Sequence, residues 1–473
     1  MEKVRLPVIQ GGPGTAPRNE LMSSLRADGG RNFQYPADVR GRFMRWRRLL
    51  FAVLIAFWAV VPFIRVHGRP FLMLDVEHRH FFIFGGVFGA QDAWRLWFIL
   101  TGVGLALVIA TSMTGRVWCG YACPQTVFLE GFFRPIERAI EGPRESRMKL
   151  DAGPWTASKV LRKVAKHAVF VFLAALVAHV FVGYFVSPYR LWEMIFAGPR
   201  AHPEAFAWAI GLTGVFYGNF AFFREQTCVG ICPYGRLQSV LVDPDTVTVG
   251  YDAPRGEVRA KAADKAKNPE LGDCVDCKRC VVVCPMGIDI RNGLQPDCIG
   301  CAQCIDACDE IMDKLHRPRG LIRYDTSRAH NGGGRVILRP RAYLYMVLSA
   351  VWLVAAVFLL RGRIEFEANI ARVGASPFIL EGDLVRNAFN VHVVNKGSDP
   401  QTVELVAKGD GVTFAMPIKH ADLGAFGGVT VPVIATVPRS ATAMPIPITV
   451  EIKSRDGSIR TVQAVLLGPG GKS

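Results

Sequence analysis

Cysteine is missing from both ends of this chain. All twelve cysteines lie between Cys119 and Cys308, and the last third of the 473 residues contains none. Thiols confined to segments that we place in the cytoplasm fit a reducing compartment. This distribution argues against a disulfide framework and favours metal ligation.

Several short motifs are also missing. No C-x-x-C-H run attaches a c-type haem, and no C-x-x-x-C-x-x-C run offers a radical site. No G-x-G-x-x-G run marks a dinucleotide site and no flavin motif is recognisable, so the sequence does not name an electron donor. Because the first apolar run starts near Leu49, after a polar and basic stretch, we expect no N-terminal signal peptide.

Apolar and basic residues are abundant. Half of the residues are hydrophobic and the net charge is +16. The basic residues stand beside long apolar runs, where the positive-inside rule expects them, so we expect a membrane partner and no nucleic acid.

Five apolar runs have about the length that crosses a lipid bilayer. They are residues 49–64, 96–113, 168–186, 205–223 and 343–360. Basic clusters before the first run, after the second and after the fourth place these segments in the cytoplasm. Five spans then put the C-terminal region on the outer face, where short alternating strands separated by turn residues predict a β-sandwich that docks a partner.

The predicted fold class is a multi-domain membrane protein. It combines an α-helical transmembrane bundle of about five spans, a cytoplasmic two-cluster ferredoxin-like domain and a C-terminal all-β immunoglobulin-like sandwich. The expected segments are a disordered basic cytoplasmic tail (1–40), transmembrane helices 1–4 with two C-x-x-x-C-P motifs (41–240), the ferredoxin-like domain (241–340), transmembrane helix 5 (341–361) and the periplasmic sandwich (362–473).

Two cysteine-rich runs predict a pair of 4Fe-4S clusters. The pattern C-x-x-C-x-x-C-x-x-x-C occurs twice, from Cys274 to Cys284 and from Cys298 to Cys308. In such pairs the fourth cysteine of each run ligates the other cluster. We therefore assign cluster 1 to Cys274, Cys277, Cys280 and Cys308, and cluster 2 to Cys298, Cys301, Cys304 and Cys284. Zinc ribbons are the alternative, and Asp309 replaces the proline expected after Cys308.

A second pair of motifs, C-x-x-x-C-P, lies just past the cytoplasmic ends of two spans. Its members are Cys119, Cys123, Cys228 and Cys232. We expect Cys123 and Cys232 to precede helix starts, where the helix dipole favours thiolate. Four such thiols could bind copper as Cu(I) or another metal centre, cycle between dithiol and disulfide, or pack as buried cysteines.

Histidines supply further candidate ligands. His179 lies inside the third apolar run, where an ionisable residue is a functional candidate, and we include it in the copper site. His67, His78 and His80 lie in the first outer loop near Met73 and could attract copper from outside.

The motifs together resemble a known family. The runs C-G-Y-A-C-P-Q from Cys119, C-x-x-x-C-P-Y from Cys228 and C-P-M-G-I-D-I-R-N-G-L-Q from Cys284 look like those of the cytochrome c oxidase accessory proteins called CcoG, FixG or RdxA/RdxB. The resemblance implies a multi-pass protein of the bacterial inner membrane that reduces Cu(II) to Cu(I) for the copper site of cbb3-type oxidase. It implies oxidase assembly factors and copper-handling proteins as partners, an unidentified electron donor, and a homodimer as one arrangement.

Two other functions remain open at this point. One is a quinol-linked conduit that carries electrons to a periplasmic reductase, similar to the membrane components of nitrate or nitrous oxide reductase systems. The other is a non-enzymatic assembly scaffold or redox sensor, in which the clusters report redox state and the sandwich holds a partner.

Overall fold

A computed structural model describes residues 33–469, apart from residues 67, 78, 90–92, 262–267, 269, 331–332, 335–338, 362–365, 375, 398, 441–444 and 456. Two compact units are present. The first contains the chain up to Arg65, Pro70–Met73 and Phe98–Val354, and the second contains Val66–Arg69, Leu74–Trp97 and the chain from Ala355.

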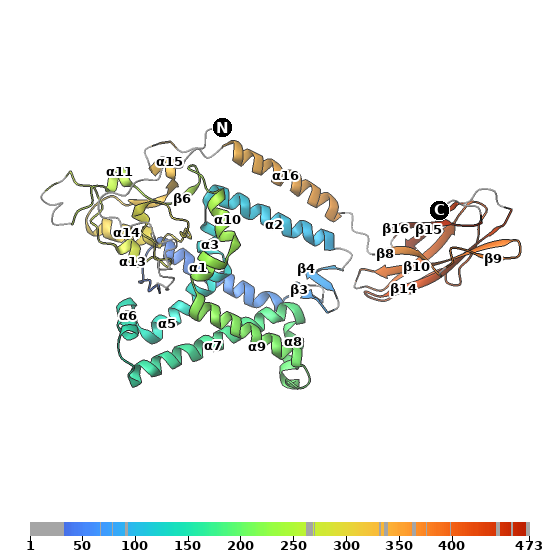
Figure 1. Ribbon diagram of the computed structural model, residues 1–473, viewed down its shortest axis with the longest axis horizontal. Helices are drawn as coiled ribbons and strands as arrows, with labels where there is room; N and C mark the ends of the chain where they lie inside the picture. Colours follow the sequence, from blue (N-terminus) through green and yellow to red (C-terminus); the bar gives the residue numbers. More distant parts are fainter. Residues whose placement is uncertain are drawn as a thin grey trace. The chain divides into compact units, whose positions relative to one another are not determined.

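Five helices in the described residues are long and apolar enough to cross a membrane, as predicted. They are α1 (Arg42–Val60), α2 (Ala93–Thr114), α7 (Ala157–Val186), α9 (Pro203–Gly218) and α16 (Pro340–Arg361) (Figure 1). The short helix η1 (Val61–Phe63) extends α1, and the π-helix η4 (Asn219–Phe223) extends α9. On α1 the exposed residues Leu49, Val53, Phe57 and Val60 repeat every three or four positions, which makes a lipid-facing stripe.

Short helices follow the spans. Between α2 and α7 lie α3 (Val117–Tyr121), α4 (Pro124–Phe128), the π-helix η3 (Leu129–Phe133), α5 (Arg134–Glu141) and α6 (Arg144–Ala152). Helix α8 (Pro188–Ala197) follows α7, and the π-helix η5 (Thr227–Ile231) and α10 (Pro233–Leu241) follow α9. Helices α4, α5, α8 and α10 have proline in their first turn. Proline suits a first helical position because its missing N–H would have no partner there.

The cysteine-rich region folds around a two-stranded antiparallel sheet of β6 (Val247–Tyr251) and β7 (Ile322–Thr326). It also contains α11 (Ala253–Gly256), α13 (Arg279–Val282), η6 (Ile290–Asn292), α14 (Gln303–Lys314) and α15 (Ser327–His330). Ile305, Met312, Leu321 and Ile322 pack in its core. This region belongs to the same compact unit as most of the membrane helices.

The second unit contains the predicted sandwich. One sheet has the order β12 (Thr413–Ala415), β14 (Gly428–Pro438), β10 (Leu384–Asn395), β8 (Phe366–Arg372), with β9 (Ile379–Glu381) also paired to β10. The other has the order β13 (His420–Leu423), β11 (Gln401–Lys408), β15 (Ile446–Ser454), β16 (Ile459–Leu466). Alternate residues of both sheets, including Phe389, Val391, Leu405, Val433 and Val450, form the core.

Short strands form the loop between α1 and α2. They are β1 (Arg65–Val66), β2 (Arg69–Pro70), β3 (Leu72–Asp75), β4 (His80–Ile83) and β5 (Gly86–Phe88). The last three form one antiparallel sheet.

The expectation of a disordered tail up to residue 40 is wrong for residues 33–40, and residues 1–32 lie outside the described part. Ala37 and Val39 are buried. The Ala37 N–H donates to the Val282 carbonyl at 3.0 Å, and Arg147 donates to the Pro36 carbonyl at 3.0 Å. These partners lie more than a hundred residues away, so local composition could not reveal them.

Candidate metal centres

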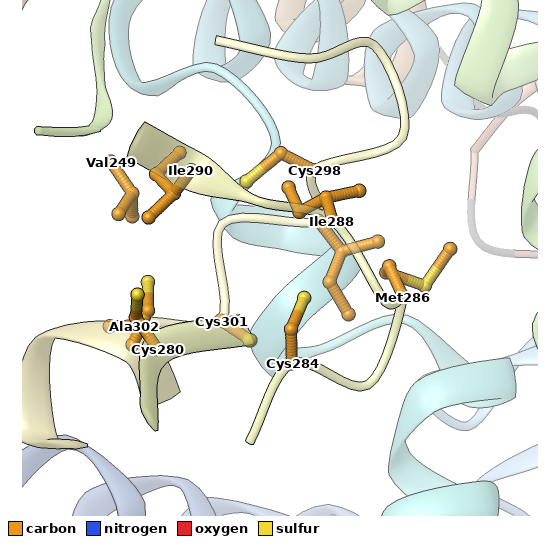
Figure 2. Close-up of a pocket in the computed structure, with 11 residues that line it drawn as sticks. Val249, Cys280, Cys284, Met286, Ile288, Ile290, Cys298, Cys301 and Ala302 are labelled. Carbon is orange, nitrogen blue, oxygen red and sulfur yellow. The ribbon is translucent and has the colours of Figure 1, made fainter. Parts of the chain in front are cut away.

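Two cavities lined by cysteines lie in the cysteine-rich region, the part of the chain from β6 to β7. We call the first the proximal cavity; its walls include Cys280, Cys284, Cys298, Cys301 and Cys304. Figure 2 shows four of these cysteines around it, together with apolar Val249, Ile288 and Ile290. We call the second the distal cavity; it is lined by Cys274, Cys277, Cys280 and Cys308, with Tyr251, Met312 and Arg291 among its other walls.

The fourth cysteine of each run lies in the cavity of the other run. Cys284 lines the proximal cavity beside the second run, and Cys308 lines the distal cavity beside the first. Cys280 borders both, and with Cys274, Cys277 and Cys308 it completes the four thiols of the distal cavity. The structure therefore brings together the two groups of four thiols that crosswise ligation requires.

The thiols are spread around each cavity. In the described part of the chain, no three His, Cys, Asp or Glu side chains converge closely enough to hold a single metal ion. Thiols spread around an apolar cavity are the arrangement that a cluster of several irons requires.

Both runs curl in the same way. Lys278 and Ala302 follow the second cysteine of their runs and have φ of 54° and 60°, while Asp276 and Gly300 precede it and have φ of 49° and 64°. Each curl leads directly into a helix, α13 or α14. Asp309, which replaces the expected proline, accepts a hydrogen bond from the Gly320 N–H at 3.1 Å. Cys308 and Asp309 lie inside α14, so the helix continues past the fourth cysteine of this run.

Burial controls the ionisation of these thiols. It raises the pKa of Cys284 to about 12 and that of Cys298 to about 11. Burial also raises the pKa of Cys301, and the nearby Arg47 guanidinium opposes this increase. Iron ligation needs thiolates, so assembly of a cluster must release protons and bring compensating positive charge.

The two C-x-x-x-C-P motifs meet in the structure. Cys123 and Cys232 precede α4 and α10, with proline next in each helix, as predicted. After burial, the neighbouring thiols Cys123, Cys119 and Cys232 are the strongest influences on the pKa of Cys228, which reaches about 12. We call these four cysteines the paired thiols.

The sequence predicted that the helix start would favour a thiolate at Cys123, whereas in the structure the pKa of this thiol is raised. Backbone N–H groups of Gln125 and Thr126 point at its thiol and favour ionisation, but burial outweighs them and raises its pKa. The sequence revealed the helix start but not the depth of burial. Cys119 is likewise buried, which raises its pKa to about 11, and it donates a hydrogen bond to Gln238 Oε1 at 3.3 Å.

A polar clamp joins the two motifs. Gln125 and Asn219 exchange hydrogen bonds of 3.2 and 2.6 Å, and Thr227 donates to Asn219 Oδ1 at 2.6 Å. Gln125 is two residues past Cys123, and Thr227 immediately precedes Cys228. The clamp therefore fixes one motif against the other. Sequence reasoning did not find it because Asn219 belongs to neither motif.

Two of the paired thiols pack against residues that line the proximal cavity. Cys119 and Cys228 pack against the same apolar cluster as Cys284 and Cys298, around Met286 and Cys301. A Cβ atom placed on Gly120 would lie 2.6 Å from the Ile299 carbonyl oxygen and 3.0 Å from Cys301 Cα. The first motif thus lies directly on the wall of this cavity.

The histidine candidates lie elsewhere. His179 Nδ1 is hydrogen-bonded at 2.7 Å to the Ala175 carbonyl of its own helix. The described contacts do not join it to the paired thiols. His67 and His78 lie outside the described residues, while the His80 ring lies 4.5 Å from that of Phe426.

Buried arginines are the site residues that sequence reasoning missed. Arg47 and Arg134 are almost fully buried. Arg134 pairs with Glu130 and, at 3.1 Å, with Glu225, and it reaches the Pro285 carbonyl at 3.4 Å. In the sequence both arginines look like ordinary positive-inside residues, so only the packing distinguishes them.

This fold and these cavities define a membrane iron-sulfur protein that transfers electrons. Three family models match: a 4Fe-4S dicluster domain over residues 223–327, a 4Fe-4S binding domain over 96–143, and the immunoglobulin-like fold at the C-terminus of FixG over 356–469.

The full-length relatives identify the family. The nitrogen fixation protein FixG of Rhizobium meliloti is 36% identical over 79% of this chain and 79% of its own. Protein RdxA of Cereibacter sphaeroides is 35% identical over 79% of this chain and 82% of its own, and RdxB of the same organism is 34% identical over 78% and 81%. The chain belongs to the FixG/RdxA/RdxB family.

Proposed function

We propose that this protein is a cupric reductase of the bacterial inner membrane, which supplies Cu(I) for the copper site of cbb3-type cytochrome c oxidase. The observation that carries the proposal is the packing of Cys119 and Cys228 against the wall of the proximal cavity. An electron held in that cavity would have a short path to the paired thiols.

The cluster ligands are assigned as the cavities group them. Cys274, Cys277, Cys280 and Cys308 would hold one 4Fe-4S cluster, and Cys298, Cys301, Cys304 and Cys284 the other. When bound, such clusters supply one-electron transfer. The residues of the chain hold the thiols in place and exclude water, with Ile288, Ile290 and Val249 forming the apolar wall.

Copper is the proposed substrate. Each Cu(II) ion takes one electron to become Cu(I), and soft thiolate ligands favour the reduced ion. We assign Cys119, Cys123, Cys228 and Cys232 to this step and leave out His179, because its ring is bonded within α7. The basic segments beside the spans support a cytoplasmic location for the clusters and a periplasmic one for the sandwich. Oxidase assembly factors and copper-handling proteins are the proposed partners.

A second role for the paired thiols has specific support. The 4Fe-4S binding model over residues 96–143 covers Cys119 and Cys123 and no other cysteine. Four thiols are also the number that one further cluster requires. Iron analysis separates the two roles, because two clusters give about eight irons per chain and three give about twelve.

The test is anaerobic stopped-flow oxidation of the dithionite-reduced, detergent-solubilised protein by Cu(II). Cluster absorbance and Cu(I) captured by a chromogenic chelator are followed together. We expect one Cu(I) per electron lost, and a loss of the fast phase in Cys119→Ser and Cys228→Ser variants that retain their iron. Equally fast oxidation without these thiols would favour the conduit or scaffold function.

A further inference from the structure

Arg47 is a fully buried cation in the first membrane helix. Its side chain is 0% exposed, and Nε donates to the Gly120 carbonyl oxygen at 3.0 Å. The guanidinium lies 5.1 Å from the centre of the Phe51 ring and 5.8 Å from that of Tyr121. One edge of the cation therefore contacts the first C-x-x-x-C-P motif.

No carboxylate forms an ion pair with Arg47 in the described chain. Its second terminal nitrogen is buried without a hydrogen-bond partner. The first terminal nitrogen of Arg47 donates to the Gln303 amide oxygen at 2.6 Å. In this orientation the Gln303 amide nitrogen donates to the Val283 carbonyl. Glu130 lies close enough for Arg47 to influence its ionisation, and it pairs with Arg134, which also pairs with Glu225. A buried cation without a direct ion-pair partner is costly.

Two contacts of Arg47 lie next to cysteines that line the proximal cavity. Gly120, whose carbonyl it holds, lies against Cys301. Gln303, its other partner, stands between Cys301 and Cys304, which both line the cavity. Thiolates holding an iron-sulfur cluster carry net negative charge, so a cluster here would add negative charge close to Arg47.

Charged residues also line the distal cavity. Lys278, Arg279 and Arg291 are among its walls, and Arg291 forms ion pairs with Asp276 at 2.5 Å and Asp289 at 2.6 Å. Two carboxylates therefore neutralise Arg291, whereas Arg47 beside the proximal cavity has no such ion pair in the described chain. Reduction adds negative charge to a cluster, and nearby net charge is one of the factors that set its potential.

We propose that Arg47 raises the reduction potential of the proximal cluster, and so favours an electron next to the paired thiols. Arg47 is a positioning and tuning residue that acts through the cluster. The inference rests on the proposed cluster ligands and does not depend on copper as the substrate.

The test compares three variants of the full-length, detergent-solubilised protein. Arg47→Gln removes the charge and keeps a hydrogen-bond donor, and Arg47→Lys keeps the charge and loses the planar fork. Arg45→Gln is the matched control, because Arg45 lies on the same helix and is exposed. Iron content is measured first, and the midpoint potentials of both clusters are then determined by a redox titration followed by electron paramagnetic resonance.

Arg47→Gln should lower the potential of the proximal cluster by at least a tenfold change in the one-electron equilibrium, which is about 59 mV. Arg47→Lys and Arg45→Gln should change it by less, and the distal cluster should stay constant in all three. Cys308→Ser removes a ligand of the distal cluster, so the signal that it changes belongs to that cluster. This assignment identifies the cluster whose potential shifts.

Two results would overturn the proposal. One is an Arg47→Gln protein with full iron content and unchanged potentials. The other is an Arg47→Lys protein whose proximal potential falls by more than about 59 mV, a tenfold change in the one-electron equilibrium. That result would show that the geometry of the side chain sets the potential and that its charge does not. The second result decides the matter even if Arg47→Gln does not fold. Dithionite-driven Cu(II) reduction, measured on the same samples, tests the copper function separately.

Discussion

Gly120→Ala should separate the first C-x-x-x-C-P motif from the proximal cavity. The added Cβ would lie 2.6 Å from the Ile299 carbonyl oxygen, and ordinary contacts begin at 3.4 Å, so the two backbones must move apart by about 0.8 Å. Overpacking of this kind costs about 1–3 kcal/mol. The better helix propensity of alanine offsets about 1 kcal/mol of that cost. We expect a lower midpoint of thermal unfolding and slower electron transfer to Cu(II), with iron content retained.

The second motif provides a matched control. Gly230 lies inside it, between Cys228 and Cys232, and a Cβ there would meet no atom within 4 Å. Gly230→Ala should therefore change the free energy of unfolding by no more than about 0.5 kcal/mol. Both variants are compared by thermal unfolding in one detergent and by the stopped-flow assay. If Gly120→Ala matched Gly230→Ala in both measurements, the close contact of the first motif with the cavity would be refuted.

Two further predictions concern the clusters and the buried charges. Cys284→Ser should remove the proximal cluster signal and leave the distal one, and iron analysis with electron paramagnetic resonance would contradict crosswise ligation if the distal signal disappeared instead. Burial disfavours ionised Glu137, but Arg224 and its other cationic neighbours prevail and lower its pKa from 4.5 to about 2. Since the folded pKa lies below the unfolded one, this contribution to stability is present above pH 4.5 and is lost as the pH falls toward 2. Glu137→Gln should flatten that part of the pH–stability curve measured by chemical denaturation, and an unchanged curve would exclude this role.

The sequence predicted the elements whose signals are periodic or closely spaced. The five apolar helices and the strands of the sandwich follow from side-chain alternation along the chain. Helix α7 starts at Ala157, well before the apolar run that indicated it, because its first turns carry lysines at the membrane boundary.

Long-range contacts could not be predicted in this way. The grouping of the cysteines followed from a known ligation pattern, but their burial did not. The clamp residue Asn219, the buried Arg47 and the partners of residues 33–40 depend on segments that are distant in sequence. An arginine in a basic run next to a span has the same local pattern whether it faces lipid headgroups or a cluster cavity.

The predicted boundaries near residues 240 and 340 separate parts that the structure joins. Asp306, between Cys304 and Cys308, accepts hydrogen bonds from the N–H groups of Phe43 at 3.2 Å and Met44 at 2.8 Å, and so caps the first membrane helix from the cysteine-rich region. Ion pairs and caps of this kind are satisfied only while the two regions stay together. An electron carrier needs a fixed distance between donor and acceptor, and a tethered ferredoxin-like domain would not provide one. The buried contacts at Asp306 and Arg134 therefore hold the cysteine-lined cavities in a fixed position against the membrane helices.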